Sequence, residues 1–276
     1  MKKILVPIDF SKEAKYACEV AAQIAKKTKC EIILLHMLDI PGISIDPIDT
    51  NNMRGGAQAI FFMKTIHKKF QKYKALPFFE GIKIKESVKF HKAFNGVIEE
   101  SKNNNVDLIV MGSQGATGLK EMLVGSNTEK VVRHSDIPVL VIKKKVTDFD
   151  IKNMIFACDF SKESKNSFKN VLSFANIFNA KLHLLFINTI HNFESTRESN
   201  LKLEKFAVGV DKKKLTLNIY NDTTIEEGIL NFGKEIDADL IAINTHGRSG
   251  LSQLFSESIS KELANHALRP IITFKI

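Results

Sequence analysis

The chain has 276 residues, of which 44% are hydrophobic and 26% charged, as in a soluble globular protein long enough for one large domain or two of ordinary size. No apolar stretch approaches the roughly 20 residues of a membrane helix, and the short apolar start ends at Asp9 without a cleavage site, so we expect a cytoplasmic protein with no membrane partner. The formal net charge of +9 comes mostly from scattered lysines without interleaved aromatic residues, which argues against a specific nucleic-acid partner.

Strands and helices alternate along the first half of the chain. Apolar runs predict strands, and amphipathic stretches predict helices, the first of them capped by Ser11. The loop with Pro41, Gly42 and Pro47 could cover a ligand or simply connect a strand to its helix. The predicted elements are strand 3–8, helix 11–28, strand 31–37, helix 56–74, strand 81–88, helix 93–104, strand 106–111, helix 126–134 and strand 138–143.

The second half repeats this order. Residues 157–165 match residues 7–15 at six of nine positions, 150 residues further along, which indicates a duplicated domain. We expect two domains, 1–145 and 151–276, joined by the charged stretch 144–151. The predicted elements are strand 152–157, helix 162–178, strand 181–187, helix 194–209, strand 215–220, helix 224–236, strand 239–243, helix 256–267 and strand 270–275.

This alternation predicts an α/β fold of two tandem, doubly wound, open parallel sheets, each five-stranded with helices on both faces. Ligands bind such sheets beyond the carboxyl ends of the strands, where the strand order reverses. Asp9 and Gly112, at the ends of the first and fourth strands, should meet there. The last strands, 138–142 and 270–274, are short, apolar and led by proline, so we expect them at sheet edges. The two halves could pair these edges as an intramolecular pseudo-dimer, and a homodimer of the whole chain stays open.

The clearest functional signal lies between strand 106–111 and helix 126–134. It reads Gly112-Ser113-Gln114-Gly115, then nine residues, then Gly125-Ser126-Asn127. Glycines allow close backbone approach, and the N–H groups of a helix N-terminus hold anions, so the segment is a candidate phosphate site. An isolated Gly-x-x-Gly would more simply make a turn. The third glycine, the adjacent serine and the matching first strand favour the phosphate site.

The sequence resembles the universal stress protein family, and the resemblance extends over both halves of the chain. The resemblance is carried by Pro7-Ile8-Asp9, by His36-Met37, and by the segment from Met111 to Ser126, because Gly-x2-Gly-x9-Gly-Ser is the ATP-binding signature of the family. It implies an adenine-nucleotide alpha-hydrolase-like fold. It also implies an adenine nucleotide, ATP or ADP, as ligand in the first half, with Mg²⁺ as a further candidate.

The resemblance also implies a role for each matching residue, although each has a structural alternative such as a cap or a core position. Asp9 would hold ribose hydroxyls and Met37 would meet the adenine, while the glycines and the helix N-terminus would close on ribose and phosphates. The implied binding residues are Pro7, Asp9, Met37, Met111, Gly112, Gly115, Gly125, Ser126 and Asn127.

The second half departs from this pattern. Ala157 replaces the proline, and Glu257 stands where the third glycine belongs, so that only Gly247 and Ser258 of the fixed positions remain. A carboxylate there would repel phosphate, so we expect this half to bind nucleotide poorly or not at all. His246 has no evident partner for catalysis.

No phosphate-binding Gly-x4-Gly-Lys-Ser/Thr loop, zinc motif or nucleophile elbow occurs, so we expect neither catalytic nor metal-ligating residues. The expected function is a stress-response regulator or sensor that binds an adenine nucleotide. A slow ATPase or AMP-forming enzyme, and a nucleotide-free interaction or scaffold protein, stay open. Cys18, Cys30 and Cys158 are expected to be reduced packing residues, and the clusters 143–145 and 212–214 to be solvated lysines.

Overall fold

The structure is a computed structural model that describes residues 1–38, 53–90, 93–113, 125–245 and 269–276. The strands in these ranges are β1 (Lys3–Pro7), β2 (Glu31–Met37), β3 (Ile84–Lys89), β4 (Leu108–Gly112), β5 (Val139–Ile142), β6 (Asn153–Ala157), β7 (Lys181–Asn188), β8 (Leu215–Asn221), β9 (Leu240–Thr245) and β10 (Ile271–Lys275). The α-helices are α1 (Lys12–Thr28), α2 (Met53–Lys74), α3 (Ala93–Asn103), α4 (Ser126–His134), α5 (Lys162–Phe178), α6 (Thr196–Phe206) and α7 (Ile225–Glu235).

The strands and helices expected within the described ranges are all present, with ends shifted by a few residues. Two short 3₁₀ turns, at Pro77–Phe79 and Lys212–Lys214, were not predicted. The predicted helix 256–267 and the loop that holds Pro41, Gly42 and Pro47 lie outside the described residues.

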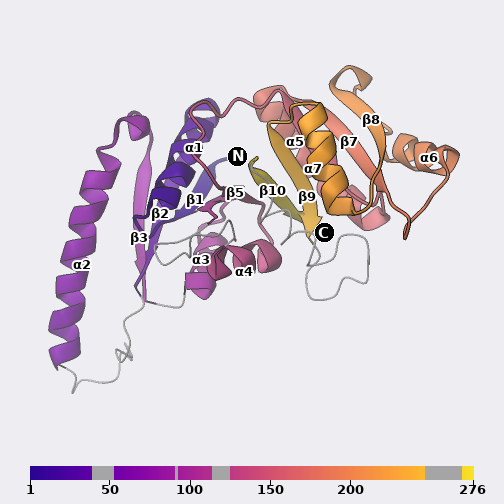
Figure 1. The fold of residues 1–276 in the computed structure, drawn as a ribbon. Coiled ribbons are helices and arrows are strands. Elements are labelled where there is room, and N and C mark those ends of the chain that lie inside the picture. The colour runs from indigo at the N-terminus through magenta and orange to yellow at the C-terminus, as the bar shows by residue number, and fades with distance from the viewer. Residues whose placement is uncertain (39–52, 91–92, 114–124, 246–268) are drawn as a thin grey trace.

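All ten strands belong to one sheet, in the order β3-β2-β1-β4-β5-β10-β9-β6-β7-β8. Each half is a five-stranded parallel sheet, which confirms the predicted α/β class. The halves join where β5 and β10 pair in antiparallel fashion, with Val141 opposite Ile271 and Val139 opposite Thr273. Figure 1 shows these two strands at the centre of the molecule.

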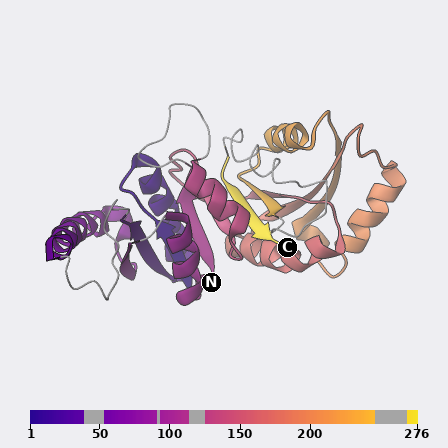
Figure 2. The same ribbon diagram turned by 90° about the horizontal axis from the view of Figure 1, so that it is seen from below.

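Helices cover both faces of the sheet, but the two faces are organised differently. One face carries α1, α2, α5 and α6 over a single apolar core that runs through both halves. The other face carries two separate cores, under α3 and α4 in the first half and under α7 in the second. Figure 2 shows α2 and α6 at opposite ends of the molecule.

The duplication extends to single residues. Ser11 and Ser161 cap α1 and α5 by accepting a hydrogen bond from the backbone N–H three residues on, at 3.1 and 3.2 Å. Phe10 and Phe160, just before these caps, have left-handed φ values of 64° and 56°. A bulky residue adopts this conformation only when its surroundings compensate the strain, so both halves keep the same turn after the first strand.

The stretch between the halves is anchored at both sides. Phe149 is buried, its backbone N–H donates to Gln23 Oε1 at 2.7 Å, and its ring packs edge-on against Phe178 of α5. Asp150 pairs with Lys27 of α1 at 3.3 Å. This linker consists largely of charged residues, but its Phe149 side chain is part of the apolar core between α1 and α5.

All three cysteines are buried and unpaired, which confirms their assignment as packing residues. Burial raises the pKa of the Cys158 thiol, so it stays protonated at neutral pH. The expectation that residues 143–145 are solvated is wrong for Lys143, which is partly buried just after β5, whereas Lys144 and Lys145 are exposed.

Replacement of Lys143 by methionine should stabilise the fold at neutral pH. Burial lowers the pKa of Lys143 to about 8 from the ordinary 10.5, so the unfolded chain holds this proton more tightly, and wild-type stability rises as pH increases from 8 to 10.5. After allowance for solvent screening, we expect Lys143→Met to add about 1–2 kcal/mol at pH 7 and less near pH 9.5. Urea unfolding at the two pH values measures this difference. Lys144→Met is the control, and an equal gain at both pH values would contradict the explanation.

Candidate functional site

A cavity of about 220 Å³ lies at the carboxyl edge of the first half, between β1 and β4, where the strand order reverses. The structure brings eight of the nine predicted binding residues to its wall, and the ninth, Gly115, lies outside the described residues. The lining residues are Pro7, Ile8, Asp9, Ala14, Leu35, Met37, Ala93, Val97, Met111, Gly112, Gly125, Ser126, Asn127 and Thr128.

Asp9 reaches the cavity because the chain turns sharply after β1. Its Oδ1 accepts a hydrogen bond from the Ser11 N–H at 2.9 Å, which fixes the carboxylate at the start of α1. Phe10 has a left-handed backbone conformation, and its ring lies on the side away from the cavity, edge-on to Phe70 and Tyr73. These aromatic contacts offset the backbone strain and thereby hold Asp9 in place.

His36 does not line the cavity, although it neighbours Met37 in the motif. Its ring lies against Phe10 with centroids 4.9 Å apart, and its Nδ1 is 2.7 Å from the carbonyl oxygen of Ile8. Burial lowers the pKa of His36, so the ring is neutral at pH 7 and donates to Ile8. His36 therefore stabilises the turn after β1 through its contacts with Ile8 and Phe10.

Gly112 allows the end of β4 to touch α1. A Cβ atom at this position would lie 2.8 Å from the backbone carbon and 2.9 Å from the backbone oxygen of Glu13. The carbonyl of Gly112 also accepts a hydrogen bond from the buried Thr128 Oγ1 at 2.9 Å. The missing side chain of Gly112 thus lets β4 lie close to α1, and its carbonyl links β4 to α4 beside the cavity.

The amino end of α4 faces the same cavity. Gly125 is the N-cap and has no side chain to bond the first helical N–H groups. Its own N–H donates to the Ser113 carbonyl at 2.6 Å, which joins the start of α4 to the residue after β4. Ser126 and Asn127 are exposed, so the helix N-terminus and the Ser126 hydroxyl are open to an anion.

The remaining wall is apolar, and most of it was missed in the sequence. Leu35 and Val97 are buried side chains that flank Met37 and Met111 on the face covered by α3 and α4. A flat apolar group fits such a wall, while the carboxylate and the helix N-terminus serve polar groups. The available signal was the alternation of β2, because Leu35 lies two residues before Met37 and shares its face.

In the second half, serine hydroxyls donate hydrogen bonds to the side chains at the corresponding positions. Asp159 Oδ1 accepts hydrogen bonds from the Ser161 N–H at 3.1 Å and from the Ser164 hydroxyl at 2.6 Å, and Ser164 stands where the first half has Ala14. Asn244, at the position of Gly112, is buried and accepts a hydrogen bond from the Ser167 hydroxyl at 2.7 Å. The sequence shows Ser164 and Asn244 at these positions, but their hydrogen bonds were not predicted. Gly247, Glu257 and Ser258 lie outside the described residues.

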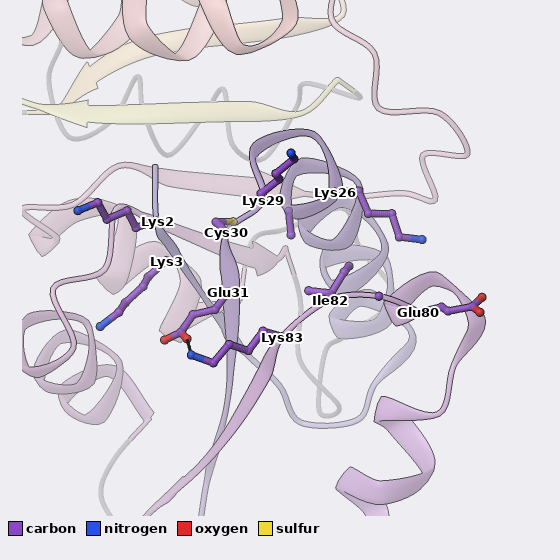
Figure 3. A pocket seen from close by; sticks show the side chains of 11 residues that line it. Lys2, Lys3, Lys26, Lys29, Cys30, Glu31, Glu80, Ile82 and Lys83 are labelled. Atoms are coloured by element: carbon purple, nitrogen blue, oxygen red, sulfur yellow. Dashed lines mark ion pairs between the residues drawn. The ribbon is translucent and has the colours of Figure 1, made fainter.

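A second cavity, of about 670 Å³, lies at the amino edge of the first half. Figure 3 shows lysines on its rim, with Lys2 and Lys26 pointing in opposite directions and Lys83 paired to Glu31 at 2.7 Å. The carboxyl end of α1, whose dipole disfavours anions, also borders it. Because its cations diverge, this cavity is a weaker anion site than the one at the carboxyl edge.

The fold and the first cavity define a tandem, doubly wound α/β protein with a pocket at the switch point of its first sheet. The model of the Universal stress protein family matches residues 1–143 and 150–275. The chain therefore belongs to the universal stress protein family.

Individual relatives agree with this assignment. The universal stress protein MJ0577 of Methanocaldococcus jannaschii is 31% identical over 163 residues, covering 52% of this chain and 96% of the relative. The universal stress protein YxiE of Bacillus subtilis is 30% identical over 158 residues, covering 51% and 98%. A crystal structure of a universal stress protein from Archaeoglobus fulgidus shares the fold across 99% of this chain and 96% of its own, with a TM-score of 0.68 at 22% identity.

No helix among the described residues is both long and apolar enough to cross a membrane. Within the same residues, no group of three or more histidine, cysteine, aspartate or glutamate side chains is arranged to hold a metal ion.

Proposed function

We propose that the chain binds one adenine nucleotide, ATP or ADP, in the cavity of its first half and acts as a stress-response regulator or sensor. The observation that carries this proposal is the meeting of eight motif residues from β1, β2, β4 and α4 around one cavity. A turn-forming role for the glycines would not require Asp9 and Met37 to lie at the same place.

Each part of the cavity suits one part of the nucleotide. Leu35, Met37 and Val97 offer apolar surface for the adenine, and the Asp9 carboxylate can accept hydrogen bonds from both ribose hydroxyls. The open N-terminus of α4 suits the phosphates. Because Asp9 is the one carboxylate among the described lining residues, Mg²⁺ would be held mainly by phosphate oxygens and water.

The second half is proposed to bind no nucleotide and to serve as a structural partner. Asp159 and Asn244 are already hydrogen-bonded to Ser164 and Ser167. Through β5 and β10 the two halves would act as an intramolecular pseudo-dimer. The described lining of the first cavity offers no second acid or base beside Asp9, which favours binding over hydrolysis. Three unpaired buried cysteines suit a reducing compartment, so we propose the cytoplasm.

The test is the small-molecule content of the purified protein. After gel filtration and denaturation, ultraviolet absorbance and mass spectrometry of the extract should show ATP or ADP at no more than one per chain. Refilling the emptied protein with ATP, ADP or cAMP then ranks the ligands, cAMP being the molecule held in one solved universal stress protein. An extract without nucleotide, together with no binding on refilling, would overturn the proposal.

A further inference from the structure

The cavity of the first half has no positive side chain on its described wall. Its described lining residues include neither lysine nor arginine, and the Asp9 carboxylate adds a negative charge. The N-terminus of a helix supplies the equivalent of only about half a positive charge. A nucleotide with several phosphates would therefore bind more tightly if a cation lay close to the amino end of α4.

Lys143 is a cation that the sheet places beside this helix end. The pairing of β4 with β5 aligns Gly112 with Ile142, so Lys143 is the next residue along, beside Ser113. The Ser113 N–H donates to the Ile142 carbonyl at 2.9 Å, and the Ser113 carbonyl accepts a hydrogen bond from Gly125, the N-cap of α4. Two backbone hydrogen bonds thus connect the start of α4 to the residue before Lys143.

The strand also places Lys143 on the face of the sheet that carries α4. Ile142 belongs to the core under α1, whereas Val141 belongs to the core under α3 and α4. Side chains alternate between the two faces along a strand, so Lys143 shares the face of Val141. Lys143 and the amino end of α4 therefore lie on the same face and at the same edge of the sheet.

Lys143 is partly buried and has no anionic partner in the described part of the chain. Burial is the sole cause of its lowered pKa. When the register of β5 and β10 is continued, the residue opposite Lys143 is Arg269, a second cation, which pairs with Asp237 at 3.2 Å. A charge that is withdrawn from water without a partner costs stability. Such groups concentrate at functional sites.

The duplicate of Lys143 in the second half has the partner that Lys143 lacks. The segment around the last strand of each half begins with proline and ends with lysine, so Lys275 is the counterpart of Lys143. Lys275 donates to Asp136 of the first half at 2.5 Å. Asp136 stands two residues before the proline, where the second half has Leu268 in its sequence. Among the described residues, the ammonium is thus paired in the half that departs from the nucleotide motif and unpaired in the half that keeps it.

We propose that Lys143 contacts the terminal phosphate of the bound nucleotide and thereby favours ATP over ADP and AMP. This inference rests on the proposed nucleotide site. Lys143 stands outside the cavity wall, so it serves the phosphates that extend past the amino end of α4. Its ammonium donates charge-assisted hydrogen bonds to their oxygens. The residues that line the cavity hold the adenosine of all three nucleotides alike.

Isothermal titration of the nucleotide-free chain with ATP, ADP and AMP tests this assignment. Lys143→Met should lower the affinity for ATP by about tenfold or more, because a hydrogen bond to a charged group contributes free energy of that order. The affinity for ADP should fall less, and the affinity for AMP should not change. Lys144→Met and Lys275→Met are the matched controls, one the exposed neighbour and the other the counterpart in the second half. Both should bind all three nucleotides as the wild type does.

The stability of the same variant separates a phosphate contact from a structural role. Urea unfolding should show that Lys143→Met is at least as stable as the wild type, so that weaker ATP binding does not come from a damaged fold. Undiminished ATP affinity in Lys143→Met, or an equal loss for ATP and AMP, would overturn the assignment of Lys143 and leave the nucleotide site in place. A wild type that binds none of the three nucleotides would overturn the proposed function and this inference with it.

Discussion

Gly125→Glu is expected to lower the affinity for ATP by about 100-fold, which corresponds to about 2.7 kcal/mol of binding free energy. Gly125 is the N-cap of α4, with φ −61° and ψ 146°, a conformation that any residue can adopt. A glutamate there would repel the phosphates and could itself accept the N–H bonds of the first helical turn. Isothermal titration of the nucleotide-free variant measures the loss.

Gly125→Gln separates charge from size. Glutamine fills nearly the same volume without the negative charge, so we expect less than about a fivefold loss of affinity, since a neutral side chain leaves the helix dipole free to attract phosphate. Equal losses in both variants would show that bulk alone blocks the site. Undiminished affinity in Gly125→Glu would mean that the phosphates lie elsewhere.

Gly112→Ala is expected to destabilise the fold by about 1–3 kcal/mol and to weaken nucleotide binding at the same time. The new methyl group would lie 2.8 Å from the backbone carbon of Glu13, and backbone atoms of a helix move less readily than a side chain. α1 and β4 must separate, which also moves Asp9 away from the other residues that line the cavity. Urea unfolding and ATP titration of the same variant measure the two effects.

Gly233→Ala provides a control of opposite sign. Gly233 lies within α7, and a Cβ there would be 3.5 Å from the nearest atom, the end of the Ile155 side chain, which is ordinary contact. Alanine in a helix is favoured over glycine by up to about 1 kcal/mol, so this variant should be stabilised. If both variants shifted stability in the same direction, close backbone approach would not be the role of Gly112.

The strands, the helices and the place where the predicted binding residues meet could be predicted from the sequence. Strands such as β1 and β4 are continuous apolar runs, and α1 begins at a serine cap. The carboxyl ends of parallel strands share one edge, so Asp9 and Gly112 could be placed together although they are a hundred residues apart in sequence. The motif spacing then located the helix N-terminus at Gly125.

Features that depend on packing between distant segments could not be predicted. Phe149 stands in a charged stretch, and only the approach of α1 to α5 buries it. Lys143 looks like the start of a solvated cluster, but it follows β5, where the two halves pair, and it is partly desolvated there. Asn244 was visible as a departure from glycine, yet its bond to Ser167 depends on the placement of α5.

On the proposed function, one nucleotide site exists per chain and lies in the first half. Isothermal titration of ATP into the nucleotide-free full chain tests it most directly, with the Gly125→Glu variant titrated in parallel. We predict a stoichiometry of one for the wild type and about 100-fold weaker binding for the variant. Two equivalent sites in the wild type, or undiminished affinity in the variant, would show that this assignment of the site is wrong.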